Sequence, residues 1–157
     1  MNKITPFLWF DGKAEEAMNF YVSIFKNSKA LNVTRLGKPG QVPGGEVLVA
    51  SFILDGQEFR ALNGGPHFTF TPAISFLVDC ESQQEVDDLW DKLSVGGESL
   101  NCGWIKDKFG LTWQIIPAIL PKMLQDKDPA KAERVRQAMM QMQKIHIPSL
   151  QRAYDQT

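Results

Sequence analysis

Two stretches of the sequence decide the fold: FDGKAEEAMNFYVSIF at residues 10–25 and DCESQQEVDDLWDKL at residues 79–93. Each places a turn or cap signal in front of apolar residues spaced three and four apart, which is the pattern of an amphipathic helix. Superposing Ala17 on Val86 makes the rest of the two apolar stripes coincide. The sequence therefore predicts the same surface helix twice, which indicates an internal repeat.

The two predicted helices begin with different signals. Asp11 or Gly12 is suited to cap the first helix. In the second, Ser82 and Glu85 form an S-x-x-E capping box, in which each residue satisfies a backbone N–H near the start of the helix.

Strand-like runs surround each helix in the same order, one before it and three after it. They are TPFLWF, ALNVTRLG, GEVLVASFIL and QEFRALNG in the first copy and TPAISFLVDC, a weak ESL, CGWIKD and LTWQIIPAIL in the second. Asp55 and Gly56 form a hairpin signal. A four-stranded sheet with one helix cannot cover both of its faces, so two copies can enclose a shared cavity. We predict an α+β fold of two βαβββ modules forming a curved mixed sheet, followed by C-terminal helices.

The composition bounds the class of protein. The chain has 157 residues, is 43% hydrophobic, and carries 17 basic and 18 acidic side chains without a basic run. It therefore lacks the field that draws in nucleic acid or an anionic membrane. The N-terminus has no signal-peptide pattern, and no window approaches the roughly 20 apolar residues of a membrane span. We expect a cytoplasmic protein with Cys80 and Cys102 as buried free thiols.

A helical segment follows the second module. Asp128 and Pro129 form a cap and a first-turn proline, and Pro148 opens a last short helix. The apolar stripe between them consists of Ala132, Val135, Met139, Met142 and Ile145. A methionine-bearing face can be a partner groove or a lid, but packing is the more common role. We expect these helices to cover the sheet or a subunit interface.

Four stretches, taken with the order of the modules, carry a family resemblance. They are PFLWFDGKAEEAMNFY, LNGGPHFTFTPAISFLVDC, GWIKDKFGLTWQIIP and RVRQAMMQMQKI. They resemble the PhnB-like branch of the glyoxalase, bleomycin-resistance and extradiol-dioxygenase superfamily (vicinal oxygen chelate fold), often labelled 3-demethylubiquinone-9 3-methyltransferase-like. The resemblance implies a homodimer and a single glyoxalase-like domain over 1–157, with module one at 1–66, module two at 67–118 and a helical extension at 119–157. It implies the fold more firmly than any one reaction.

Metal-dependent members of this superfamily hold a divalent ion with His, Glu or Gln from the first and last strands of each module. The resemblance puts Gln114 at the place of the family's carboxylate. The other ligand positions fall on Thr5 or Pro6, on Ala73 or Ser75, and within 61–63, which contain neither histidine nor carboxylate. We therefore expect no metal of the superfamily type and no other cofactor, although a divalent ion stays an alternative.

Methyl transfer and nucleophilic hydrolysis are both disfavoured by the motifs. The glycine-rich loop that would follow a parallel strand to hold a cofactor is absent, and the pairs at 44–45, 64–65 and 96–97 have the pattern of turns. There is also no G-x-S-x-G nucleophile motif. No catalytic residue is assigned.

Polar and aromatic residues on the predicted strands are the candidate ligand contacts, because alternation sends about half of them into the cavity. The predicted ligand-binding residues are Asn63, Ser75, Trp104 and Gln114. Arg60 and Lys106 also lie on these strands; in the alternative interpretation they face solvent and the tryptophans are core. We favour a small-molecule-binding protein. The alternatives are a metal-dependent lyase, isomerase or dioxygenase, and a scaffold that uses its C-terminal helix.

Overall fold

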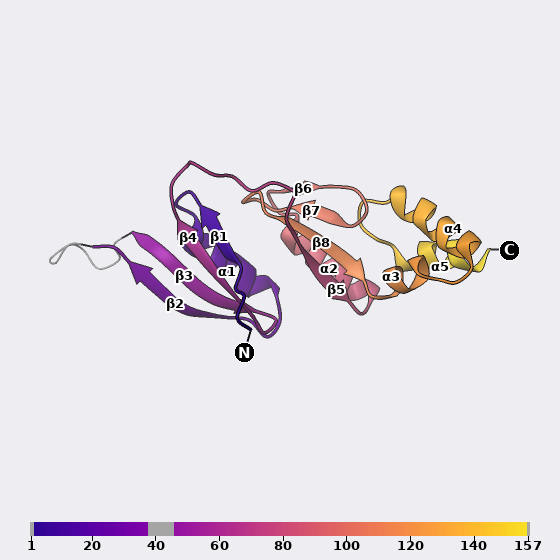
Figure 1. Cartoon of the computed structure of the whole chain (residues 1–157), viewed down its shortest axis with the longest axis horizontal. Helices are drawn as coiled ribbons and strands as arrows, with labels where there is room; N and C mark the ends of the chain where they lie inside the picture. Colours follow the sequence, from indigo (N-terminus) through magenta and orange to yellow (C-terminus); the bar gives the residue numbers. More distant parts are fainter. Residues whose placement is uncertain (1, 38–45, 157) are drawn as a thin grey trace. The chain divides into compact units, whose positions relative to one another are not determined.

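The computed structural model describes residues 2–37 and 46–156, and the glycine pair at 44–45 lies outside them. The chain divides into two compact units, Met1–Phe70 and Thr71–Thr157. Each unit is built on one four-stranded mixed sheet with a helix (Figure 1). The predicted α+β class with C-terminal helices is confirmed. None of the described helices is long and apolar enough to cross a membrane.

The first unit has the predicted order of elements. They are β1 (Phe7–Phe10), α1 (Ala14–Ile24), β2 (Lys29–Arg35), β3 (Val47–Leu54) and β4 (Gln57–Asn63). In the sheet the order is β1-β4-β3-β2, with β1 parallel to β4 and the other pairs antiparallel. Asp55 and Gly56 form the β3–β4 turn with φ of 45° and 79°. These left-handed values are those of a two-residue hairpin turn, so the hairpin signal is confirmed.

Helix α1 covers one face of this sheet. Its Tyr21 is fully buried and stacks on Phe52 of β3 with 6.4 Å between ring centroids. Along β4 the buried residues are Phe59 and Ala61, and alternation places Asn63 on the same face. The other face carries partly exposed side chains, including Phe7 at 53% exposure.

The start of α1 differs from the prediction. Lys13 occupies the N-cap position and provides no side-chain hydrogen bond, so the predicted cap at Asp11 or Gly12 is wrong. Instead, Oδ1 of Asn63 accepts a hydrogen bond from the backbone N–H of Ala14 at 2.9 Å. A side chain from β4 therefore takes the role of a cap, because the first N–H groups of a helix have no partner within it.

The second unit repeats the module. Its elements are β5 (Ser75–Cys80), α2 (Gln83–Leu93), β6 (Glu98–Ser99), β7 (Trp104–Lys106) and β8 (Thr112–Pro117). The sheet order is β5-β8-β7-β6, and β5 is parallel to β8. The order of strands and the parallel pair match those of the first unit.

The capping box of α2 is present. The Ser82 hydroxyl accepts from the N–H of Glu85 at 3.1 Å, and the Glu85 carboxylate accepts from the N–H of Glu81 at 2.9 Å. The four predicted stripe residues are all buried: Val86, Leu89, Trp90 and Leu93. The helix packs on the sheet, whose Ile105, Trp113 and Ile115 are at most 3% exposed.

Three helices form the C-terminal extension: α3 (Ile119–Leu124), α4 (Pro129–Met140) and α5 (Ile147–Asp155). Asp128 caps α4 by accepting from the N–H of Ala130 at 3.0 Å, as predicted. A buried apolar cluster joins the extension to the end of β8 and consists of Ile116, Leu120, Met123, Val135, Ile145 and Leu150. The predicted stripe continues past the end of α4, because Ile145 enters this cluster from the segment before α5.

Candidate functional site

The sheet of the second unit has a row of polar and aromatic side chains on one face. Gln114 on β8 lies opposite Trp104 on β7 and opposite Leu77 on β5. Directly paired residues point to the same face of a sheet, so these three side chains share one face. It is the face opposite to that of Trp113 and Ile115, because neighbours along a strand alternate.

Two predicted ligand contacts touch each other on this face. Nε2 of Gln114 donates a hydrogen bond to Oγ of Ser75 at 2.9 Å, from the last strand of the module to its first. Ser75, Trp104 and Gln114 are each half-buried. Of the four predicted ligand contacts, the structure therefore brings these three together on one face. Among the described residues, the bond to Ser75 is the hydrogen bond that the Gln114 side chain makes. The carbonyl oxygen of the Gln114 amide is therefore available to another donor.

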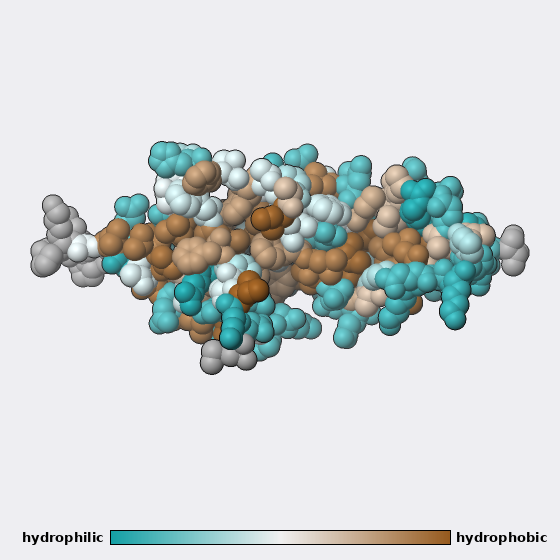
Figure 2. Space-filling view, viewed as in Figure 1, coloured by the Kyte–Doolittle hydropathy of each residue, from teal (hydrophilic) through white to brown (hydrophobic). Residues whose placement is uncertain are grey.

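The rest of the face is mixed, because Leu77 is apolar whereas Lys106, opposite Thr112, and Asp79, opposite Ile116, are charged. Leu77, next to Gln114, is 52% exposed although it is in the middle of a strand. Figure 2 shows apolar surface gathered over the strands of this unit. The arrangement combines apolar area with a small number of polar groups, which is typical of a small-molecule site.

Thr112 adds an unusual feature to the same strand. It is fully buried, and within the described residues its Oγ1 has no hydrogen-bond partner. It lies opposite Ser75 in the ladder and two residues before Gln114, so it belongs to the same face. An unpartnered buried hydroxyl costs about 1–3 kcal/mol, which native proteins tolerate only at few positions.

The start of β8 is held by Asp107, a residue that the sequence analysis missed. Its carboxylate is 3% exposed. One oxygen accepts from the N–H groups of Phe109 and Leu111 at 2.8 and 3.1 Å, and the other accepts from Nε1 of Trp113 at 2.9 Å. The signal was present, because a D-x-x-G turn precedes the strand, and an Asp in such a turn bonds nearby N–H groups. Asp107 thereby sets the register that places Gln114.

Asn63 belongs to the first unit, on the side of its sheet that α1 covers, and both ends of its amide are used. Oδ1 accepts from Ala14, and Nδ2 donates to the backbone oxygen of Val47 at 3.0 Å. Arg60 is exposed and lies 3.8 Å from Glu58, and Lys106 is half-buried opposite Thr112.

The donors on this face do not fit the metal that the superfamily implies. The groups at its centre are the Ser75 hydroxyl and the Gln114 amide, which are bonded to each other, and the face also has the Thr112 hydroxyl and the single carboxylate of Asp79. Divalent transition metals in such sites are held by imidazole and carboxylate. In the two described segments, no group of three or more His, Cys, Asp or Glu side chains is placed to hold a metal ion. Thr5, Pro6 and Ala73 lie just before the strands on which ligands would be expected.

Cys80 behaves as a core residue. It is fully buried at the end of β5, and burial raises the pKa of its thiol from 9.0 to about 12, with a smaller contribution from Glu85 and Asp79. The neutral thiol is therefore the form at physiological pH, which is not that of a nucleophile. Cys102 is also a free thiol but is only partly buried.

A groove of about 590 Å³ also lies in the extension. Its charged side chains are bonded within the extension. The carboxylate of Glu133 accepts two hydrogen bonds from Arg136 at 2.7 and 2.8 Å, which lowers the pKa of Glu133. Asp126 accepts from the hydroxyl of Tyr154 at 2.7 Å, which lowers the pKa of Asp126. The first pair lies within α4 and the second joins the α3–α4 connection to α5, so the groove's charged groups are already engaged in contacts of the extension itself.

The two repeated modules define an α+β fold in which each module is a four-stranded mixed sheet with a helix. The chain belongs to the family described as 3-demethylubiquinone-9 3-methyltransferase, whose model matches residues 2–116. The resemblance seen in the sequence is thereby confirmed. No curated protein matches the chain.

Solved structures are also similar to the chain. The PhnB protein from Bacillus cereus is 42% identical, with a TM-score of 0.68 over 74% of this chain and 100% of its own. Protein PA1353 from Pseudomonas aeruginosa is 18% identical, with a TM-score of 0.62 over 74% of this chain and 98% of its own, and so supports the fold alone. A glyoxylase/bleomycin resistance protein/dioxygenase domain from Frankia sp. EAN1pec is 18% identical, with a TM-score of 0.44 over 74% and 92%.

Proposed function

We propose that the chain is a small-molecule-binding protein whose ligand lies on the face formed by Ser75, Trp104 and Gln114. The observation that carries the proposal is the Ser75–Gln114 hydrogen bond beside the exposed Leu77, on the face of the sheet opposite to that of Trp113 and Ile115. A structural amide would be expected inside the core, with both of its ends bonded.

The chemistry of this face indicates the class of ligand. Trp104 and Leu77 offer an aromatic and an aliphatic surface, which favour a flat or aliphatic organic molecule. The Gln114 amide and the Ser75 hydroxyl can each donate or accept a hydrogen bond. We therefore expect an organic ligand that carries a carbonyl or hydroxyl group. The proposal places Asn63 outside the site.

Methyl transfer, which the family description names, is not part of the proposal. A Cβ on Gly64 would lie 2.3 Å from the indole of Trp9, and one on Gly97 would lie 2.2 Å from the backbone oxygen of Lys106. These glycines are required by close packing, and they do not form an open loop that could cradle a cofactor. A homodimer is a further part of the proposal, and a monomeric sedimentation mass at micromolar protein would refute it.

A melting-temperature screen against small metabolites and aromatic antibiotics tests the proposal. Compounds that stabilise the wild type are measured again on Gln114→Leu and on Gln84→Leu, a substitution on the exposed surface of α2. We expect Gln114→Leu to reduce the ligand-induced rise while Gln84→Leu retains it. If both variants retain the full rise, the ligand lies elsewhere and the assigned face is wrong.

A further inference from the structure

The C-terminal extension lies beyond the residues that the family model matches, which end at residue 116. The extension is nevertheless built into the second unit. Ile116, on the same face of β8 as Gln114, is a member of its buried apolar cluster.

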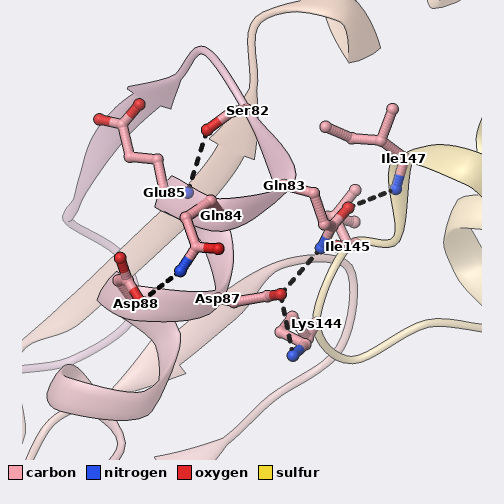
Figure 3. Close-up of polar contacts among 9 residues, drawn as sticks. All are labelled: Ser82, Gln83, Gln84, Glu85, Asp87, Asp88, Lys144, Ile145 and Ile147. Carbon is pink, nitrogen blue, oxygen red and sulfur yellow. Dashed lines mark hydrogen bonds and ion pairs between the residues drawn. The ribbon is translucent and has the colours of Figure 1, made fainter.

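Gln83 at the start of α2 fastens the extension (Figure 3). Its Nε2 donates to the backbone oxygen of Ile145 at 3.0 Å and to Asp87 at 2.9 Å, and its Oε1 accepts from the N–H of Ile147 at 2.7 Å. Lys144 lies 3.0 Å from the same Asp87 carboxylate. Both ends of the Gln83 amide therefore hold the backbone of the segment before α5, in a half-buried position.

The same segment also holds the turn that leads into β7. The N–H groups of Cys102 and Gly103 donate to the backbone oxygens of Met142 and Gln143 at 2.8 and 2.7 Å. Cys102 has a φ of 60° and Gly103 a φ of 84°. Left-handed backbone is unfavourable for a cysteine, so surrounding contacts must maintain it. The two bonds from the extension are such contacts.

This turn is directly connected to the ligand face. Trp104 is the next residue along the chain, so the backbone direction at 102–103 sets where its indole lies. The backbone oxygen of Gly103 also accepts from the N–H of Ile115 at 2.7 Å, next to Gln114. The space is tight, because a Cβ on Gly103 would lie 2.9 Å from Ile116. Displacement of the extension would therefore move the backbone that positions Trp104 and Gln114, two of the proposed ligand contacts.

We propose that the C-terminal extension positions residues of the ligand face, and that Gln83 holds the extension in place. By holding the turn at 102–103, it fixes the indole of Trp104 and the strand that carries Gln114. The expected effect of the extension on ligand binding rests on the proposed function, whereas its expected effect on the position of Trp104 does not.

The test compares Gln83→Leu with Gln84→Leu. Gln84 is the matched control, because it is a neighbouring glutamine whose amide donates only to Asp88 on α2, at 3.1 Å. Two quantities are measured: hydrogen exchange of the Cys102 and Gly103 amides, and acrylamide quenching of Trp104, isolated by subtracting the signal of Trp104→Phe in each background. In Gln83→Leu we expect amide exchange about 10-fold faster, the effect of losing roughly one buried hydrogen bond, and stronger quenching. Gln84→Leu should match the wild type.

Equal exchange and equal quenching in the two variants would overturn the positioning role. If Gln83→Leu does not fold, the same measurements are made on Gln83→Glu, which keeps the acceptor for Ile147 and loses the donor. Binding of 8-anilinonaphthalene-1-sulfonate separates this inference from the proposed function. Weaker binding of this probe in both Trp104→Ala and Gln83→Leu supports both proposals. Unchanged binding in Trp104→Ala would contradict the ligand face, while the quenching result would still decide the role of the extension.

Discussion

Asn63 and Gln114 are two amides on the last strands of the two modules, yet the structure gives them different surroundings. In the parallel ladders, Asn63 pairs with Phe10, and the corresponding pair in the second unit is Pro117 with Cys80. Gln114 corresponds instead to Arg60, which lies between the buried residues Phe59 and Ala61 and therefore points to the opposite face of the sheet. Sequence similarity between modules therefore does not carry a role from one amide to the other.

The caps of the two helices explain this difference. Helix α2 begins with the Ser82 box and needs nothing from β8, so a proline can occupy the end of that strand. Helix α1 has no side-chain cap of its own and borrows Oδ1 of Asn63. An amide that completes a helix is structural, and an amide left on a partly exposed face is free to bind a ligand.

The largest effect is expected at the turn before β8. The Asp107 side chain holds this turn, whereas the turn before β4 in the first unit is the hairpin turn of Asp55 and Gly56. Asp107→Ala removes three hydrogen bonds to a buried carboxylate. We expect a loss of about 3 kcal/mol in the free energy of unfolding, since buried donors lose a charged partner. Asp55→Gly, at the turn of the first unit, should change it by less than about 1 kcal/mol, because glycine accepts the left-handed backbone there. Urea denaturation measures both, and similar losses would contradict this account.

Asn63→Leu tests the structural role of the first amide. It removes the bond to Ala14 and the bond to Val47, so we expect a loss of about 1–2 kcal/mol in unfolding free energy. Gln114→Leu, which loses only the partly exposed bond to Ser75, should change it by less than about 1 kcal/mol. Guanidinium titrations of the two variants give the comparison. Equal losses would mean that Gln114 is also a structural amide.

Thr112→Val should have an effect of the opposite sign. The hydroxyl is fully buried and, within the described part of the chain, unpartnered, so its replacement by a methyl group removes a desolvation cost. We expect the free energy of unfolding to rise by about 1 kcal/mol. Thermal unfolding checks this. A destabilised variant would contradict the account of an unpartnered hydroxyl at this position.

The smallest expected effect concerns Cys80. It occupies the ladder position that Phe10 occupies in the first unit. Burial favours the neutral thiol, so its contribution to stability is complete below pH 9.0 and is lost as pH rises toward about 12. In native protein at pH 8, iodoacetamide should therefore modify Cys102 and spare Cys80, as peptide mass analysis would show. Rapid modification of Cys80 without denaturant would contradict its place in the core.

The sequence predicts elements well where the signal is local. The Ser82 box, the Asp128 cap and the Asp55-Gly56 turn each need only a few neighbouring residues, and each is present. The cap of α1 could not be found in this way, because Asn63 is distant in sequence and reaches Ala14 through the β1–β4 pairing. The face of the sheet on which Asn63 lies could nevertheless be predicted. Phe59 and Ala61 alternate with the charged residues Glu58 and Arg60, and Asn63 continues the row of Phe59 and Ala61.

The candidate site was predicted in part for the same reason. Alternation along β8 separates Gln114 from Trp113 and Ile115, and that separation is present in the structure. The bond between Gln114 and Ser75 depends on the pairing of β5 with β8 and has no local signal. The bonds from residues 142–143 to the turn before Trp104 depend on the packing of the extension and have no local signal either.

The most direct test of the central claim observes both amides in one experiment. In a two-dimensional ¹⁵N–¹H spectrum, the side-chain NH₂ signals of Asn63 and Gln114 are assigned with Asn63→Leu and Gln114→Leu. A compound selected by the melting screen is then titrated into the wild type. The account predicts that the Gln114 signals shift in proportion to bound ligand while those of Asn63 stay in place. Shifts of the Asn63 signals with unchanged Gln114 signals would contradict it.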